Sequence, residues 1–292
     1  MKKNLPLLGR IALLSTAIIW GTSFVVLKNT LNDVGTLWVL AIRFTAATAL
    51  MLALVRGRLR GVSRRCLKGS VLMGVALASA YIIQTYGLYY TTPGKNAFLT
   101  ATYCVLTPFL AWLFYRRKPG LSNILAAMLC ITGIGFVSLG TGFGAINRGD
   151  VLTLFSGLFY SLQIILMEQY IDSGEAAAIS AVQFLTAAVI CWAGALLFEK
   201  PPVDVPAAAW GSIAYLSVMC TGVCFFLQAW GMRYTPSSSA AMIMTLEAVF
   251  GALVSILFYH EVVTARVALG FALIFAAVVM SELRPFRGRK LA

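Results

Sequence analysis

The eight residues Gln84-Thr-Tyr-Gly-Leu-Tyr-Tyr-Thr91 recur 144 positions later, in altered form, as Gln228-Ala-Trp-Gly-Met-Arg-Tyr-Thr235. Both copies keep the glutamine, an aromatic third residue, the glycine and the final Tyr-Thr pair. Each copy is followed within two residues by a proline, Pro93 or Pro236. One such match can arise by chance, so an internal repeat requires a second match in the same order.

A second pair of related segments lies upstream of the two copies. Ile42-Arg43-Phe44 corresponds to Val182-Gln183-Phe184, 140 positions later. Two matches in the same order and at nearly the same separation predict that the chain is built from two related halves. We place these halves at residues 1–143 and 144–292.

The composition is typical of a membrane protein. Of the 292 residues, 60% are hydrophobic and 11% are charged, and the mean hydropathy is +0.87. A soluble chain of this length carries about 25% charged residues. The composition therefore excludes a water-soluble enzyme and a nucleic-acid-binding domain, and it makes the lipid bilayer a partner of the chain.

Long apolar runs predict the fold class. A membrane-crossing helix needs about 20 mostly apolar residues, whereas the strands of a membrane β-barrel are shorter and alternate in polarity. The chain contains runs of the first kind, which predict an all-α integral membrane protein with ten transmembrane helices. The predicted spans are 8–28, 34–55, 69–90, 96–115, 121–141, 150–170, 177–198, 207–231, 237–259 and 265–283.

The distribution of basic residues predicts the orientation. Most of the 23 Lys and Arg residues fall in connections on one side of these spans, and that side carries the net charge of +13. Because basic residues accumulate in cytoplasmic loops, we predict that both termini are cytoplasmic. The start, Met-Lys-Lys before an apolar run, could also be read as a signal peptide. We interpret it as the first permanent helix, since the run is too long and no cleavage site follows it.

Five predicted helices in each half have a consequence for the architecture. Five is odd, so the second half must enter the membrane from the side opposite to the first. Such inverted repeats are found in many secondary transporters, in which a central site lies between two bundles that rock to expose it on alternate sides. A channel or a membrane enzyme could also be built in this way.

Two ionisable residues lie well inside predicted spans, Arg43 in 34–55 and Glu247 in 237–259. A charge that faces lipid costs at least about 2.5 kcal/mol, so both are expected to face the interior of the bundle. In the functional interpretation, Glu247 binds an amino group, a cation or a proton, and Arg43 holds a carboxylate. In the structural alternative, the two residues stabilise helix packing by pairing with each other or with backbone carbonyls.

A second set of candidate residues is polar or aromatic and recurs at helical spacing. These side chains can bind substrate or water, or they can form interhelical hydrogen bonds that only stabilise the fold. Tyr81 with Gln84, and Tyr160 with Gln163, are three residues apart and project from one helix face. The full set of predicted substrate-binding or coupling residues is Glu247, Arg43, Trp20, Ser23, Tyr81, Gln84, Tyr103, Tyr160, Gln163 and Gln228.

Pro108 is the candidate gating residue. It lies inside the predicted span 96–115, where its missing N–H frees a backbone carbonyl. We expect the helix to bend there, because prolines are the commonest cause of helix kinks.

Residues that would indicate catalysis are few. The one histidine, His260, cannot by itself form a Ser-His-Asp relay or a two-histidine metal site. The six cysteines match no metal-site spacing and are expected to pack as small apolar side chains. We therefore predict a protein that is not an enzyme and that holds no metal.

Several motifs together resemble the drug/metabolite transporter superfamily, specifically chains built from two EamA domains. Trp20-Gly-Thr-Ser-Phe24 is similar to the signature of the family's first helix, and Ile42-Arg43-Phe44 resembles the Arg-Phe of its second helix. Pro93-Gly-Lys-Asn-Ala-Phe-Leu-Thr100 and Gly149-Asp150 are also similar to family motifs. Each motif is short, and the resemblance rests on their order and spacing over the whole chain.

The ninth predicted helix resembles the family with two departures. Leu246-Glu247 and Glu261 are similar to a Leu-Glu-Pro…Gly-Glu pattern. In this chain Ala248 replaces the proline and His260 replaces the glycine. The missing proline implies a helix that bends less than in the family's other members.

The resemblance implies a ten-helix carrier for small metabolites, commonly an exporter of amino acids, their derivatives or toxic organic compounds in the bacterial inner membrane. It implies no bound cofactor. We therefore predict a secondary transporter that exports amino acids or related amphiphilic metabolites by alternating access, with the proton as a further candidate partner. The first alternative is a carrier for cationic drugs or organic amines. More distant alternatives are a membrane scaffold without transport activity and a membrane enzyme.

Overall fold

The computed structural model describes residues 5–55, 63–116, 118–138, 147–170, 176–235 and 243–283, and over these ranges the chain is helical without β-strands. The predicted all-α fold is therefore confirmed. The helices are α1 (Leu5–Thr30), α2 (Thr36–Val55), α3 (Arg64–Tyr90), α4 (Pro93–Ala101), α5 (Tyr103–Tyr115), α6 (Leu121–Ser138), α7 (Arg148–Tyr170), α8 (Ala176–Phe198), α9 (Ala207–Tyr215), the π-helical segment η4 (Leu216–Val223), α10 (Cys224–Tyr234), α12 (Leu246–Phe258) and α13 (Ala265–Leu283).

Helix length and polarity fit an integral membrane protein. Within the described residues, seven helical segments are long and apolar enough to cross a membrane, and three shorter apolar helices accompany them. Because hydrocarbon offers the backbone no hydrogen-bond partner, such segments satisfy their N–H and C=O groups inside the helix. The seven segments are 5–30, 36–54, 64–90, 93–114, 148–167, 177–198 and 207–228, and the shorter helices are 121–137, 246–258 and 265–281. The first residues of the predicted span 237–259 lie outside the described ranges.

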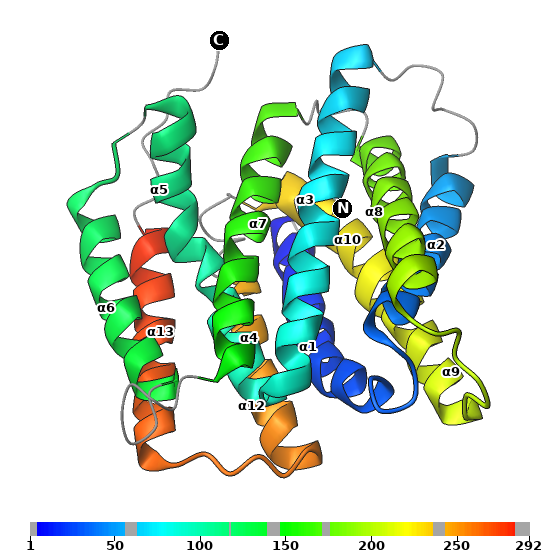
Figure 1. The fold of residues 1–292 in the computed structure, drawn as a ribbon. Helices are drawn as coiled ribbons and strands as arrows, with labels where there is room; N and C mark the ends of the chain where they lie inside the picture. Colours follow the sequence, from blue (N-terminus) through cyan, green and yellow to red (C-terminus); the bar gives the residue numbers. More distant parts are fainter. Residues whose placement is uncertain are drawn as a thin grey trace.

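The helices form a bundle in which neighbours in space are far apart in the sequence (Figure 1). α3 packs along α7, α2 along α8, and α6 along α13, while α1 contacts both α10 and α12. One apolar core, around Phe44 and Phe184, joins α2, α3 and α8. A second core joins α4, α5, α6, α12 and α13, and there the rings of Phe98 and Phe271 stack with centroids 4.2 Å apart.

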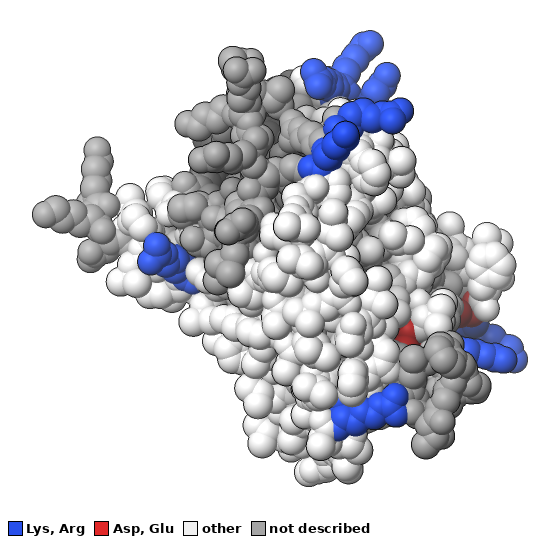
Figure 2. All heavy atoms as spheres, turned by 90° about the vertical axis from the view of Figure 1, so that its left-hand side faces the viewer, with Lys and Arg blue, Asp and Glu red and all other residues white. Residues whose placement is uncertain are grey.

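The outer surface is apolar, as contact with lipid requires. On α5 and α6, Leu113, Leu121, Met128 and Ile131 are each between 63% and 71% exposed. Figure 2 shows uncharged residues over a broad part of this side of the molecule, with Lys and Arg at its margins. Extended apolar patches are rare on soluble monomers, so this surface supports the membrane assignment.

Two helices are interrupted at related positions. Thr102 separates α4 from α5 inside the predicted span 96–115, with φ −61° and ψ −16°. Thr245 precedes α12 with nearly the same angles, φ −63° and ψ −17°. The two threonines are 143 positions apart, which is also the separation of Pro93 and Pro236. Interrupted helices at corresponding places of two halves are a feature of transporter binding sites.

Pro108, where we expected the bend, lies six residues beyond the interruption. It is buried inside α5, and its missing N–H frees the carbonyl of Cys104. Ser281 Oγ of α13 donates a hydrogen bond to that carbonyl at 3.5 Å. A neighbouring helix thus supplies a partner and α5 continues through the proline, while a gating role for Pro108 stays a prediction.

The predicted span 207–231 contains the π-helical segment η4 between α9 and α10. In a π-helix the backbone bonds reach five residues instead of four, and short π-helical turns are frequent at functional sites. The side chain of Thr221 follows this spacing, because its Oγ1 donates to the carbonyl of Leu216 at 3.0 Å. The wider turn orients Thr221 towards α2.

The repeated motif brings helices of the two halves into backbone contact through its glycine. A Cβ at Gly87 would lie 2.9 Å from the carbonyl oxygen of Gly149, and a Cβ at Gly149 would lie 2.5 Å from that of Gly87. Gly231, the second copy of Gly87, meets Gly9 in the same way, with corresponding distances of 2.9 and 3.1 Å. α3 therefore approaches α7 as α10 approaches α1.

We expect Gly87→Ala to lower the free energy of unfolding by about 1–3 kcal/mol, because overpacking a rigid interface displaces backbone. The new Cβ would also lie 2.6 Å from Thr153 Oγ1. Thermal unfolding in detergent measures the loss. Gly211→Ala is the matched control, since no atom lies within 4 Å of its Cβ, and alanine there should stabilise the helix by about 0.5–1 kcal/mol. Equal or higher stability of Gly87→Ala would contradict the close approach of α3 and α7.

Candidate functional site

Six aromatic rings form a continuous chain through the bundle. In order, the rings are those of Trp20, Phe225, Phe184, Phe44, Tyr81 and Tyr160. The two outermost contacts have centroids 5.5 and 5.6 Å apart and interplanar angles of 67° and 68°. The next contacts inward have centroids 5.0 and 5.3 Å apart and angles of 84° and 81°. The central contact, between Phe184 and Phe44, is stacked, with centroids 6.3 Å apart and an angle of 26°.

Rings at equal distance from the centre of this chain occupy corresponding positions in the two halves of the sequence. Phe44 and Phe184 are 140 positions apart, as are the two outermost rings, Trp20 and Tyr160. The remaining two rings are 144 positions apart, like the copies of the repeated motif. The chain of rings therefore crosses the centre of the proposed repeat, and the polar side chains around it form the candidate site.

Arg43 lies beside these rings and is only 2% exposed. Its Nε donates to Thr221 Oγ1 at 2.6 Å, and its guanidinium carbon lies 4.9 Å from the centroid of the Tyr81 ring. Among the described residues, its two terminal NH2 groups have neither a hydrogen-bond acceptor nor a carboxylate partner. A guanidinium fixed by its inner nitrogen and by a ring face can still donate two parallel hydrogen bonds to a carboxylate.

Glu247 is 6% exposed and lies in the first turn of α12, two residues after Thr245. The start of a helix is a favourable place for a negative charge, because the backbone N–H groups there point towards it. Within the described part of the chain no donor bonds this carboxylate, and the ion pair found there joins Lys95 to Asp150. Arg43 and Glu247 therefore do not neutralise each other in this conformation.

Arg43 also borders the tyrosines of the aromatic chain. Its guanidinium lies over the Tyr81 ring, whose centroid is 5.6 Å from that of Tyr160. Arg43 comes from α2, the two tyrosines come from α3 and α7, and Glu247 belongs to α12. Three helices thus meet where Arg43 contacts the aromatic chain.

Hydrogen bonds link the predicted tyrosine and glutamine residues across helices. Tyr160 Oη donates to Gln84 Oε1 at 2.6 Å, and Gln84 Nε2 donates to Thr100 Oγ1 at 2.8 Å. Gln163 Nε2 donates to Gln183 Oε1 at 3.0 Å. Gln183 is the repeat partner of Arg43, and its buried Nε2 has no hydrogen-bond partner within the described residues. A free donor at this depth is available to a substrate or a water molecule.

The other predicted residues are placed less uniformly. Trp20 Nε1 donates to a carbonyl of η4 at 2.7 Å, and the Tyr103 ring centroid lies 6.0 Å from that of Tyr160. Ser23 Oγ donates to the Trp20 carbonyl of its own helix at 2.6 Å. Gln228 Nε2 lies 3.7 Å from a methionine sulfur. The hydrogen bonds of Ser23 and Gln228 therefore do not reach the Arg43 and Tyr160 groups.

Three side chains of the site were not among the predicted candidates: Thr221, Thr100 and Gln183. Gln183 could have been found from its alignment with Arg43 in the repeat. Thr100 carried a weaker signal, its place in the Pro93–Thr100 motif. Thr221 gave none, because it is a lone threonine in an apolar span and faces Arg43 only through the π-helical turn.

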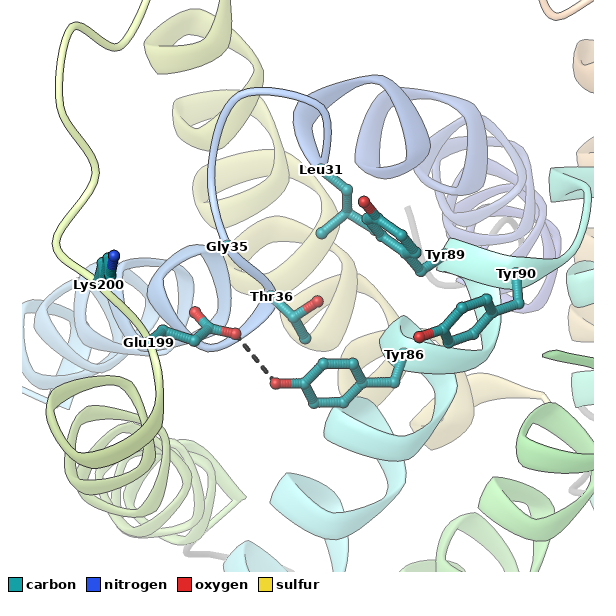
Figure 3. Close-up of a pocket in the computed structure, with 8 residues that line it drawn as sticks. All are labelled: Leu31, Gly35, Thr36, Tyr86, Tyr89, Tyr90, Glu199 and Lys200. Carbon is teal, nitrogen blue, oxygen red and sulfur yellow. Dashed lines mark hydrogen bonds between the residues drawn. The ribbon is translucent and has the colours of Figure 1, made fainter. Parts of the chain in front are cut away.

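A separate cavity of about 360 Å³ opens at one end of the bundle (Figure 3). Tyr86 Oη donates there to Glu199 Oε1 at 3.0 Å. None of the predicted candidates lines this cavity, so it is distinct from the central site. Its lining residues are Leu31, Gly35, Thr36, Tyr86, Tyr89, Tyr90, Glu199 and Lys200. Over the described ranges no three His, Cys, Asp or Glu side chains come together as a metal site would need.

Comparison with known proteins identifies the family. The model of the EamA-like transporter family matches this chain twice, over residues 7–139 and 147–283. The chain belongs to the EamA-like transporter family. The predicted resemblance is therefore confirmed, and membership makes the protein an integral membrane transporter.

Individual relatives agree with this assignment. An uncharacterized transporter of Archaeoglobus fulgidus is 30% identical over 92% of this chain and 83% of its own length. The uncharacterized transporter YoaV of Bacillus subtilis is 22% identical over 93% and 95%. The biotin transporter of Escherichia coli is 21% identical over 85% and 84%. One solved crystal structure, 16% identical, shares the fold with a TM-score of 0.66 over 97% of this chain and 99% of that chain.

In this EamA-like transporter, Tyr160→Phe should lower the free energy of unfolding by about 1–3 kcal/mol, because it leaves the buried amide oxygen of Gln84 without its donor. Tyr81→Phe is the matched control, since no hydrogen bond of the Tyr81 hydroxyl is found within the described residues, and it should change stability little. Thermal unfolding of the two variants side by side makes the comparison. Equal losses would mean that the Tyr160–Gln84 hydrogen bond adds no stability.

Proposed function

We propose that this EamA-like transporter is a secondary carrier that exports amino acids or related amphiphilic metabolites across the inner or plasma membrane by alternating access. In this proposal the chain crosses the membrane ten times, as two inverted five-helix repeats that meet near residues 143 and 144, with both termini cytoplasmic. Transport itself follows from family membership. The substrate class and the mechanism rest on the central site.

The observation that carries the proposal is a pair of buried ionisable side chains, Arg43 and Glu247, that form no ion pair within the described residues. Leaving a charge inside a membrane protein without a partner is costly, so such residues usually mark a substrate or ion pathway. Within the part of the chain that the structure describes, the terminal N–H groups of Arg43 bond no acceptor and would suit a carboxylate, and Glu247 would offer an acceptor to an ammonium group. A zwitterion with an apolar part would satisfy both charges and pack on Tyr81 and Tyr160.

A second candidate substrate class is supported by each charge alone. Glu247 together with the aromatic chain would suit an organic cation, since carboxylates and ring faces both attract cations. Arg43 alone would suit an anionic carboxylate, and the relative from Escherichia coli is named a biotin transporter. The experiment therefore has to include all three classes.

We expect counterflow in proteoliposomes to identify the class. Vesicles loaded with unlabelled amino acids, organic cations or carboxylates such as biotin receive the labelled compound outside, and accumulation above equilibrium marks the substrate. Glu247→Gln should reduce uptake of amino-bearing substrates at least about tenfold, and Arg43→Gln should do the same for carboxylate-bearing ones. Asp33→Asn, an exposed carboxylate, is the control and should leave uptake unchanged. Full activity of both site variants would remove the two charges from the substrate site.

Coupling to protons gives a separate prediction. If the Glu247 carboxyl carries a proton in exchange for substrate, transport by the wild-type chain depends on pH and the residual transport of Glu247→Gln does not. Counterflow measured between pH 5 and 9 tests this. A variant with the wild-type pH profile would leave Glu247 with substrate binding or packing only.

The proposed topology can be tested without a substrate. Cysteines introduced at Val62 and Asp204 should react with a membrane-impermeant maleimide from opposite faces of the membrane. The native cysteines among the described residues are buried and give a low background. Labelling of both positions from one face would contradict the ten-helix arrangement.

A further inference from the structure

Carboxylates hold one end of the bundle together. At this end, the lower one in Figure 1, α1, α3, α8 and α12 finish and α2, α4, α7 and α13 begin. We call it the capped end. The carboxylates are those of Asp150, Glu199 and Glu261. Each belongs to the second half of the sequence and accepts a hydrogen bond from a residue of the first half.

Glu199 caps the start of α2 from the end of α8. Its two oxygens accept the backbone N–H of Leu37, each at 3.1 Å, and Oε2 also accepts that of Trp38 at 3.3 Å. Oε1 accepts the hydroxyl of Tyr86 as well. Gly35 makes room for this carboxylate, because a Cβ there would collide with Oε2. The contact therefore joins α8 to both α2 and α3.

Glu261 caps the start of α4 from the α12–α13 connection. Its Oε2 accepts the backbone N–H of Gly94 at 3.0 Å, and its Oε1 accepts the hydroxyl of Thr92. A Cβ at Gly94 would lie 2.6 Å from Oε2, so glycine again makes room for the carboxylate. The neighbouring His260 has φ +53°, a left-handed conformation that favours glycine, and it turns the chain so that Glu261 meets α4.

Asp150 adds a third link between the same parts of the chain. Its Oδ1 accepts the hydroxyl of Thr91 at 2.5 Å, and its Oδ2 lies 4.0 Å from Lys95 Nζ. The C-terminus of α3 is closed by Lys28, whose Nζ donates to carbonyls there at 2.6, 2.8 and 3.0 Å. Apart from the ion pair of Asp150 with Lys95, these links satisfy backbone groups at a helix terminus or a hydroxyl near one.

The repeat places different residues at the related positions. The partner of Asp150, 140 positions earlier, is Arg10, and the partner of Glu261, 143 positions earlier, is Lys118. Both are exposed. These carboxylate links therefore have no counterpart at Arg10 and Lys118, although the helices that carry them are related by the repeat.

We propose that Glu199 and Glu261 are latches that hold the capped end of the transport pathway closed, and that both contacts must break when the pathway opens there. The inference rests on the proposed alternating-access function. Charge-assisted hydrogen bonds to helix termini are strong and short-ranged, so each contact is either made or broken and stabilises a discrete closed state. The cavity in Figure 3 borders Glu199 and can hold the water that its carboxylate needs after release.

The test measures distances, without any substrate, in reconstituted full-length protein. Spin labels on exposed residues report the separation across each latch and at the opposite end by double electron–electron resonance. The variants are Glu199→Gln and Glu261→Gln, which keep the side-chain shape but replace an acceptor oxygen by a donor. Asp204→Asn is the matched control, an exposed carboxylate on the α8–α9 connection. The labelled pairs are Asn32→Cys with Val203→Cys across Glu199, Tyr90→Cys with Val262→Cys across Glu261, and Leu54→Cys with Leu121→Cys at the opposite end.

In each latch variant we expect the population at longer distance across its latch to rise by roughly tenfold, which is the effect of losing a hydrogen bond to a charged group. The pair at the opposite end should shorten in the same samples, because alternating access closes one end as it opens the other. Asp204→Asn should match the wild type. The wild-type chain treated with the same label reports any reaction of the native cysteines.

Two results would overturn the latch proposal. Unchanged distances in both variants, with helix content equal to that of the wild type, would mean that the carboxylates do not control this end. Lengthening across a latch without shortening at the opposite end would make Glu199 and Glu261 helix caps only. Neither result depends on the substrate. A negative counterflow experiment would therefore contradict the proposed substrate class without affecting the latch measurement.

Discussion

The stacked rings of Phe44 and Phe184 are the contact on which the arrangement of the other helices depends. They come from α2 and α8, and the two ring contacts that continue to Tyr160 on one side are matched by the two that continue to Trp20 on the other. In the proposed inverted repeat, this is a place where a residue meets its own copy. Apolar rings suit it because stacking has no direction that the symmetry would break. The glycine contacts of α3 with α7 and of α10 with α1 follow the same relation at the next layer of helices.

The polar groups of the candidate site depart from this symmetry. Arg43 has the neutral Gln183 as its copy, and Glu247 has Cys104 at the spacing of the two interrupted helices. Both charges therefore belong to only one of two related environments. In the proposed function a single zwitterion satisfies both groups, because they are of opposite kind. At the capped end, Asp150 and Glu261 likewise have basic repeat partners, Arg10 and Lys118.

Much of this organisation can be predicted from the sequence because it depends on local pattern. Apolar runs predict the helices, and the spacing of Tyr81 and Gln84 predicts that they share a face, which Tyr160 then meets. The interruption at Thr102 could not be predicted in the same way. The sequence predicted a bend at Pro108, but Ser281 of α13 supplies a partner for the carbonyl that this proline frees. Thr221 could not be predicted as a site residue for a similar reason, because the direction of its side chain depends on a π-helical turn that tertiary packing stabilises.

That π-helical turn is related to a difference in length between two corresponding helices. α3 contains 27 residues, and its counterpart from Ala207 to Tyr234 is one residue longer. A π-helical turn, whose backbone bonds reach five residues, accommodates one residue more than an α-helical turn does. The first residues of these two helices, Arg64 and Ala207, are 143 positions apart, whereas Gln84 and Gln228 of the repeated motif are 144 apart. The extra residue therefore lies between Ala207 and Gln228. Thr221, whose hydroxyl accepts the hydrogen bond of Arg43 Nε, lies within that stretch, so the turn that takes up the extra residue also places the contact of Arg43.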